Sequence, residues 1–108
     1  METESLKRKY LPMTETAYYI LLSLNQSRHG YGIMQHVEEI TESRIKLGAG
    51  TMYGTLSKLE KDHLIIPVAE EERRKIYRLS DKGKTVLQLE MERLTELLYH
   101  GKKEMGMK

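Results

Sequence analysis

The chain has 108 residues, a length typical of one domain, with 31% charged residues, 39% hydrophobic residues and a formal net charge of +2. It has no cysteine, which excludes disulfides and thiolate metal sites, and its longest apolar run, residues 17–22, is far shorter than the roughly 20 residues that cross a bilayer. The acidic first five residues lead into no apolar stretch, so we expect no leader peptide, no membrane partner and a cytoplasmic protein.

Two helices are predicted between residues 13 and 40. Thr14 is a good N-cap for the first, which is expected to end between Gln26 and Gly30, and the second keeps its acidic and polar residues on one face. Residues 44–47 alternate polar and apolar side chains, which favours a short strand. The apolar residues at helical spacing are Met13, Ala17, Ile20, Leu21 and Leu24 in the first helix and Ile33, Met34, Val37 and Ile40 in the second.

A third helix, from about Gly50 to Lys61, follows a glycine-containing turn at residues 48–50. At about 100° per residue, Met52, Leu56 and Leu59 form a narrow apolar stripe. The opposite arc carries small residues and flexible donors suited to phosphates and base edges, and its glycine costs about 1 kcal/mol relative to alanine. The arc suits a DNA groove, and an ordinary solvated helix face is the alternative. It consists of Thr51, Gly54, Thr55, Lys58 and Lys61.

A β-hairpin is predicted next, with strands at residues 65–69 and 75–79 around a polar loop at residues 70–74. Pro67 lacks an amide hydrogen, so its strand belongs at a sheet edge. Between residues 73 and 84 the chain has six basic residues against one aspartate, and Arg73, Arg74 and Lys75 lie at the hairpin tip, where cations can bind a DNA backbone. The acids at residues 70–72 either neutralise this basic run or limit non-specific binding, and a merely solvated charged loop is the alternative.

The last predicted helix begins after the N-cap Ser80 and runs to about residue 103, which is roughly 34 Å at 1.5 Å per residue. That length exceeds what so small a domain covers alone. Leu87, Met91, Leu94 and Leu98 recur at heptad-like steps, which favours a seam between two copies of the chain. Packing against the first helix of the same chain is the alternative.

The sequence contains no recognisable catalytic or metal-binding motif. The four histidines lack metal-ligand spacing, and there is no Gly-x-Ser-x-Gly nucleophile motif. Residues 48–50 lack the Gly-Lys-Ser/Thr ending of a nucleotide-binding loop. We therefore expect no enzyme, no catalytic residue, no metal and no cofactor.

Three segments in order resemble the PadR family of bacterial transcriptional regulators, in its short form with one C-terminal helix. They are residues 30–34 (Gly-Tyr-Gly-Ile-Met), residues 50–53 (Gly-Thr-Met-Tyr) with the apolar positions that follow, and residues 74–80 (Arg-Lys-Ile-Tyr-Arg-Leu-Ser) with Gly83. The resemblance implies a winged helix-turn-helix that binds promoter DNA as a two-fold dimer, usually as a repressor. It implies that Thr51 and Tyr53 lie at the DNA or the groove edge and that residues 73–75 belong to the wing. Family members often respond to small aromatic or lipophilic compounds.

The sequence departs from the family pattern at two places. His63 stands where the family usually has the glycine that ends the recognition helix in a left-handed turn, and Gly48-Ala49 stands where a serine or similar cap is common. Histidine tolerates positive φ better than a branched residue does, so we expect this turn to form at some cost in stability. Glycine is an acceptable N-cap, so the helix itself is expected to form.

These observations predict a mainly α fold with a small β-hairpin. Residues 1–80 form a winged helix-turn-helix, and residues 81–108 form a C-terminal dimerisation helix of the same compact unit. The first function hypothesis is a repressor that binds double-stranded DNA at a pseudo-palindromic promoter site as a homodimer, with release by a small hydrophobic or phenolic effector whose site the sequence does not locate. The predicted DNA-binding residues are Gly50, Thr51, Tyr53, Gly54, Thr55, Lys58, Lys61, Arg73, Arg74 and Lys75, and the predicted dimer residues are Leu87, Met91, Leu94 and Leu98.

Two other functions are compatible with the same residues. A winged-helix scaffold without DNA binding would act as a protein-interaction module, for which the acids beside the wing are the best support. A small-molecule carrier would use an apolar dimer cleft near Tyr18, Tyr19, Met91 and Tyr99, although such residues are more often plain core. Tyr53 likewise fits either a phosphate contact or a half-buried structural tyrosine.

Overall fold

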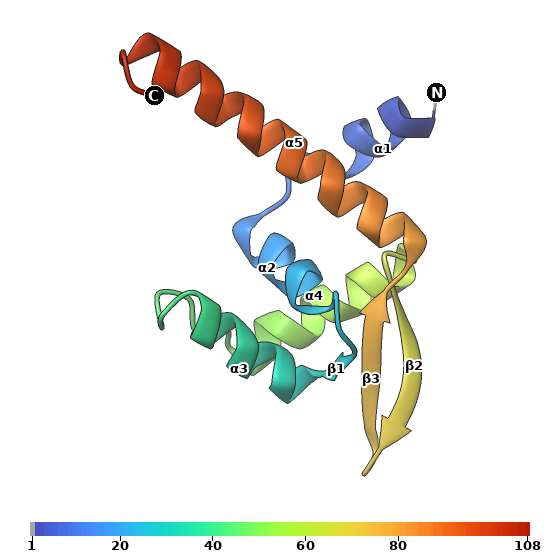
Figure 1. The fold of residues 1–108 in the computed structure, drawn as a ribbon. Helices are drawn as coiled ribbons and strands as arrows, with labels where there is room; N and C mark the ends of the chain where they lie inside the picture. Colours follow the sequence, from blue (N-terminus) through green and yellow to red (C-terminus); the bar gives the residue numbers. More distant parts are fainter. Residues whose placement is uncertain (1) are drawn as a thin grey trace.

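The computed structural model describes residues 2–108, and the chain is mostly helical around a small antiparallel sheet (Figure 1). Helices α2 to α4 and the β2–β3 hairpin form a winged helix-turn-helix, which confirms the predicted fold class. Among residues 2–108, no helix is both long enough and apolar enough to cross a membrane. The elements are α1 (Glu2–Tyr10), α2 (Glu15–Ser23), β1 (Arg28–His29), α3 (Gly30–Ile40), α4 (Ala49–Lys61), β2 (Ile65–Glu71), β3 (Arg74–Leu79) and α5 (Asp81–Glu104).

The sheet has the strand order β1-β3-β2 and so contains one strand more than the predicted hairpin. The added strand, β1, is two residues long and pairs with residues 76 and 77 of β3. β2 lies at an edge, as Pro67 predicts, and the register shifts between Pro67 and Ala69. The hairpin closes in a tighter turn than the predicted loop at residues 70–74, because Glu72 and Arg73 both adopt left-handed φ values, 50° and 66°.

One hydrophobic core joins the helices to the sheet. The predicted apolar stripe of α4 lies in it: Met52, Leu56 and Leu59 are 0%, 1% and 6% exposed. The first turns of α5 close the core over the sheet. The buried members of this core are Ile20, Leu21, Leu24, Ile33, Val37, Leu47, Met52, Leu56, Leu59, Leu64, Ile65, Tyr77, Leu79, Val86 and Leu87.

The structure corrects two expectations in the first half of the chain, the end of α2 and the strand at residues 44–47. α2 ends at Ser23 rather than between residues 26 and 30, since the chain turns there toward β1. α3 begins at Gly30 because His29 caps it: His29 Nδ1 accepts a hydrogen bond from the Gly32 amide at 3.1 Å. The strand predicted at residues 44–47 is wrong. Residues 44–47 pair with no strand of the sheet, and the segment instead buries Leu47 in the core.

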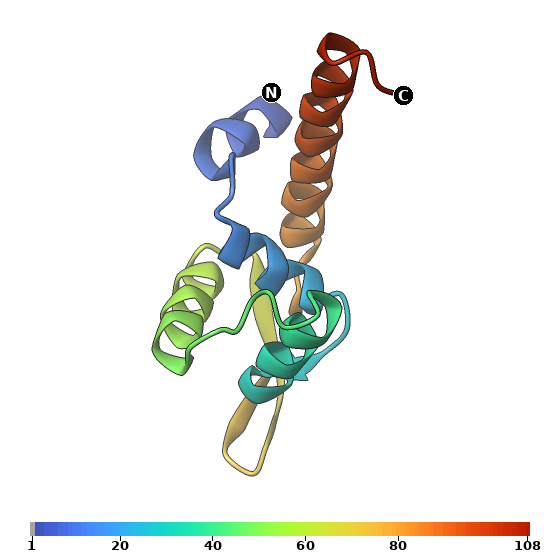
Figure 2. The same ribbon diagram turned by 90° about the vertical axis from the view of Figure 1, so that its left-hand side faces the viewer.

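The two terminal helices lie on the side of the molecule away from the hairpin. The last turns of α5 project beyond the rest of the chain, and α1 lies beside α5 (Figures 1 and 2). α1 is missing from the sequence prediction, although it has acids in its first turn and bases in its last turn. Leu6 and Tyr10, one helical turn apart, are half-buried and pack against the core.

Candidate nucleic-acid interface

The recognition helix, α4, has the ends that the sequence predicts. Gly48 is its N-cap, with extended backbone and no side-chain cap. At its other end His63 has a φ of 60°. The His63 amide donates to the Glu60 carbonyl and the Leu64 amide donates to the Leu59 carbonyl, both at 3.0 Å, which is the Schellman pattern. The left-handed turn at His63 is therefore confirmed without glycine.

The outward face of α4 is open. Thr51, Gly54 and Lys58 are exposed, while Thr55 is half-buried and donates its hydroxyl hydrogen bond to the Thr51 carbonyl at 2.9 Å. A Cβ built at Gly50 or at Gly54 would meet no atom within 4 Å. Nothing in the chain's own packing thus requires glycine on this face. A surface of small residues with lysines allows close approach of a partner's backbone.

Tyr53 lies at the edge of this face. It is 54% exposed, and its ring borders the start of α3, where a Cβ built at Gly30 would lie 2.8 Å from the Tyr53 hydroxyl oxygen. Gly30 thus makes room for the Tyr53 ring. The ring packs on the protein at one side and leaves half of its surface to solvent, so both interpretations, a groove-edge contact and a half-buried structural tyrosine, remain open as predictions.

The β2–β3 hairpin is called the wing from here on. Its basic residues are divided between its tip and its two faces. Arg73 lies in the turn, and Lys75 lies in β3 as predicted, whereas Arg74 opens that strand instead of ending the loop. Lys75 shares a strand face with the buried Tyr77, and its Nζ lies 3.7 Å from Glu60 Oε2 of α4. This ion pair joins the wing to the recognition helix. Burial, followed by the nearby Glu60 carboxylate, also raises the pKa of Tyr77.

The acids of the wing lie opposite its bases. In the β2–β3 register Glu70 faces Lys75 and Glu71 faces Arg74, while Glu72 occupies the turn. Cross-strand partners share one face of a hairpin, so these carboxylates lower the local positive potential next to the cations. The wing is accordingly less basic than its arginines and lysines alone indicate.

The end of the recognition helix is fastened to the start of α5. Ser80 donates from its amide to the Leu64 carbonyl at 3.1 Å and from its hydroxyl to the His63 carbonyl at 2.6 Å. Lys82 Nζ donates to the Asp62 carbonyl at 2.9 Å. These three carbonyls belong to residues 62–64, which directly follow α4, so the bonds connect the end of the recognition helix to the first residues of α5.

A second fastening links α5 to the segment before α2. The Glu90 side chain is 2% exposed, and its Oε2 accepts hydrogen bonds at 2.9 Å from the Met13 amide and from Arg93 Nη2. The Arg93 guanidinium and the Met13 amide hold the pKa of this carboxyl below its usual value, although burial opposes them. Sequence reasoning missed Glu90, since an acid three residues before an arginine in a helix looks like a surface pair.

The predicted dimer residues divide between the core and the surface. Leu87 is 4% exposed and belongs to the core of its own chain. Met91, Leu94 and Leu98 are 38%, 39% and 59% exposed, and Leu97 and Tyr99 beside them are also exposed. The second half of α5 thus presents an apolar face that the chain itself does not cover. Within residues 2–108 no group of three or more histidine and acidic side chains is placed to hold a metal ion.

The chain is similar to known proteins in sequence. The model of the transcriptional regulator PadR-like family matches residues 20–89. The chain is 33% identical over 69 residues to an uncharacterized 37.1 kDa protein in transposon TN4556 of Streptomyces fradiae, and 31% identical over 70 residues to uncharacterized protein X of Lysinibacillus sphaericus. The alignments cover 64% and 61% of this chain and 19% and 64% of those proteins, so the chain spans less than two thirds of either relative.

Several solved structures share the fold, and two of them illustrate the likeness. A PadR family transcription regulator from Clostridium difficile R20291 has a TM-score of 0.69 at 26% identity, with 85% of this chain and 98% of that chain covered. Sso10a-2, a DNA-binding protein from Sulfolobus solfataricus, has a TM-score of 0.64 at 20% identity, with 85% and 90% covered. The second likeness is one of fold alone.

Proposed function

Because the chain belongs to the PadR-like family of transcriptional regulators, we propose that it regulates transcription by binding double-stranded DNA as a homodimer. The observation that carries this proposal is the outward face of α4, where lysine and threonine surround two glycines that nothing in the chain covers. Glycine weakens a helix, and here no packing contact within the chain compensates for it. A DNA backbone or groove wall gives these small residues a role.

In the proposed complex, α4 lies in the major groove and the wing lies along the flanking phosphates. Thr51, Gly54 and Thr55 face the base edges and the groove wall, and Lys58 and Lys61 bind phosphates from the same helix. Arg73 and Arg74 at the wing tip are the main phosphate contacts of the hairpin. Lys75 is held by Glu60, so its contribution to affinity is smaller.

The homodimer is proposed from the second half of α5, with α1 beside it. Met91, Leu94 and Leu98 form an apolar row on a helix that projects from the body. Burial of the part of each side chain that is still exposed is favourable by about 1 kcal/mol. Two-fold pairing would place two recognition helices about 34–36 Å apart, one DNA turn, on a pseudo-palindromic site. Such a dimer, bound over a promoter, acts as a repressor.

Regulation of this dimer is proposed to act through the spacing of the two α4 helices. The bonds from Ser80 and Lys82 tie each α4 to its α5, so a change at the dimer helix alters that spacing. A small aromatic or lipophilic effector releases the DNA only if it binds the non-binding arrangement more tightly than the binding one.

The test is a fluorescence-anisotropy titration with the duplex upstream of the protein's own gene, over a series of salt concentrations. Lys58→Ala and Arg74→Ala should each weaken binding and reduce the slope of log affinity against log salt by about 1, as expected for one lost phosphate contact. Lys103→Ala, at the far end of α5, is the control and should leave the slope unchanged. Identical slopes in all proteins would overturn the assigned contacts.

The acids of the wing favour a second candidate function, a protein-interaction module that keeps the fold without binding DNA. Glu70 and Glu71 lie in register with Lys75 and Arg74, which reduces the attraction of the hairpin for phosphates. Absence of any salt-sensitive binding to the upstream duplex, together with an intact dimer, would support this candidate against the first.

A further inference from the structure

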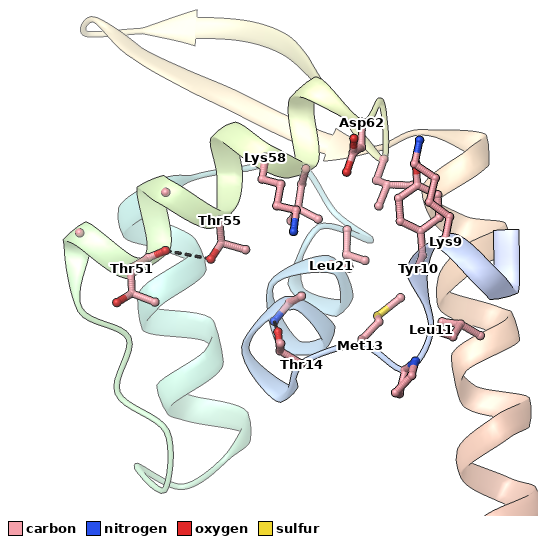
Figure 3. A pocket seen from close by; sticks show the side chains of 16 residues that line it. Lys9, Tyr10, Leu11, Met13, Thr14, Leu21, Thr51, Thr55, Lys58 and Asp62 are labelled. Atoms are coloured by element: carbon pink, nitrogen blue, oxygen red, sulfur yellow. Dashed lines mark hydrogen bonds between the residues drawn. The ribbon is translucent and has the colours of Figure 1, made fainter.

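The two flanks of α4 border different parts of the molecule. At about 100° per residue, Thr51 and Lys58 lie on one flank and Glu60 lies on the opposite one. The first flank borders a cavity of about 730 Å³ whose other wall is residues 9–14, and the Lys58 side chain points from α4 into that space (Figure 3). Glu60 is not among the residues that line the cavity. Its flank faces the wing instead.

Glu60 is the one acidic residue of α4, and it lies against two residues of β3. Its side chain is half-buried, and its Oε2 lies 3.7 Å from Lys75 Nζ. Tyr77 lies on the same face of β3, and its pKa is raised by burial and then by the Glu60 carboxylate. The contact between the recognition helix and the wing is therefore centred on this carboxylate.

The Glu60–Lys75 pair is the link between the outer part of the wing and the helices. At its base the wing is held by the sheet, since β1 pairs with Ile76 and Tyr77. Beyond that point the hairpin extends away from the helices (Figure 1). Within residues 2–108, no other ion pair or backbone hydrogen bond joins the outer part, residues 67–75, to a helix. The angle between the wing and α4 thus depends on this pair.

The same pair occupies a cation that could otherwise bind a phosphate. The Lys75 side chain is 53% exposed, so a DNA backbone can reach it, but a phosphate has to compete with Glu60 for the ammonium. Glu70 faces Lys75 across the hairpin and adds a second carboxylate on this face. Binding to DNA of any sequence comes almost entirely from contacts between cations and phosphates. Glu60 therefore reduces this non-specific attraction.

We propose that Glu60 is a positioning residue that favours the operator, the promoter site of the proposed function, over other DNA. This inference rests on the proposed function. On the operator, α4 and the wing have to fit the duplex at the same time, and a wing already held at its angle loses less conformational entropy on binding. On other DNA the base contacts are missing, and the paired Lys75 is one phosphate contact fewer. Glu60 thus raises the affinity for the operator and lowers the affinity for other sequences.

The test compares the upstream duplex with a duplex of the same length and scrambled sequence, each titrated by fluorescence anisotropy. Glu60→Gln keeps the shape of the side chain and removes its charge. It should raise the affinity for the scrambled duplex about threefold and lower the affinity for the upstream duplex about threefold. Glu104→Gln, at the far end of α5, removes the same charge away from the wing and should change neither affinity.

A variant of Lys75 separates positioning from a general loss of stability. Lys75→Gln alone should change the salt slope on the scrambled duplex little, because Glu60 already occupies that cation. When Glu60→Gln is also present, Lys75→Gln should reduce the slope by up to about 1, as expected for one phosphate contact. A merely structural role of Glu60 would not uncover a phosphate contact at Lys75. Equal effects of Lys75→Gln with and without Glu60 would overturn the proposal.

Failure of the function and failure of the inference give different results. If the unaltered protein binds the upstream duplex no better than the scrambled one, the proposed function fails, and the positioning role of Glu60 fails with it. If the unaltered protein prefers the upstream duplex but Glu60→Gln changes both affinities by the same factor, the function stands and the positioning role is overturned. A fall of about tenfold in the preference for the upstream duplex is the expected result.

Discussion

Two glycines inside helices, Gly83 in α5 and Gly54 in α4, have opposite surroundings. A Cβ at Gly83 would lie 2.0 Å from the Leu64 carbonyl oxygen, whereas a Cβ at Gly54 would meet no atom within 4 Å. The first glycine is required because α5 crosses the backbone at the end of α4. The second weakens its helix and is not required by any contact of the chain. The comparison distinguishes residues that serve the fold from residues that serve a partner.

The largest effect is expected at Gly83, where α5 crosses the backbone of Leu64 after the end of α4. Gly83→Ala should lower the free energy of unfolding by about 3 kcal/mol, because the Leu64 backbone has to shift to admit the methyl group. Urea unfolding followed by circular dichroism, at one fixed protein concentration, measures the loss. Gly101→Ala is the matched control, since a Cβ there meets nothing within 4 Å. Equal stability of the two variants would contradict the distinction between the two kinds of glycine.

A substitution at Glu90 tests how much the hydrogen bond between α5 and the segment before α2 contributes to the free energy of unfolding. Glu90→Gln should cost about 2 kcal/mol, because it removes the buried charge that holds Arg93 and the Met13 amide. The folded-state pKa of this carboxyl is lowered, so its contribution is present above the unfolded-state pKa and is lost as pH falls through the folded-state pKa.

The pH dependence provides the check on Glu90. The difference in unfolding free energy between the unaltered protein and Glu90→Gln should be largest near neutral pH and should shrink as pH falls below about 4.3, the ordinary glutamate value. Urea midpoints measured at a series of pH values show this directly. A difference that stays constant across the series would mean that packing, rather than the carboxylate, stabilises this site.

Sequence reasoning succeeded where one residue's local chemistry decides the structure. Pro67 predicted an edge strand, Ser80 predicted the start of α5, and the turn at His63 was predicted despite the missing glycine. It failed where distant segments decide. The strand at residues 44–47 does not form, and the segment instead places Leu47 in a core built from distant parts of the chain. The cavity beside α4 was missed because its two walls are far apart in the chain.

Gly54→Ala tests the second glycine of the comparison, the one that no contact within the chain requires. It should raise the free energy of unfolding by up to about 1 kcal/mol, because alanine favours the helix and its methyl group meets open space. The same methyl group should weaken DNA binding about tenfold, equivalent to about 1.4 kcal/mol, since it stands where the proposed groove wall approaches.

Opposite signs in the two measurements are the signature of a residue that serves a partner. Gly101→Ala again supplies the control: it should match the gain in helix stability, measured by urea unfolding, and leave the anisotropy titration unchanged. A Gly54→Ala protein that is both more stable and equal in DNA affinity would remove the main support for the proposed function.

The smallest effect is expected at His63, at the end of α4. Its backbone has a left-handed conformation that favours glycine over a residue with a side chain. Its φ of 60° costs a residue with a Cβ about 1 kcal/mol of stability, and glycine avoids that cost. Glycine also raises the conformational entropy of the unfolded chain, which offsets part of the gain. His63→Gly should therefore gain about 0.5 kcal/mol, and His63→Ala, which keeps a Cβ at the same φ, should gain nothing. DNA affinity should be unchanged in both, because the carbonyl bonded to Ser80 is main chain and survives either substitution. A loss of DNA affinity in both variants would show that the His63 side chain itself contacts DNA. His63 would then serve both the fold and the DNA-binding surface.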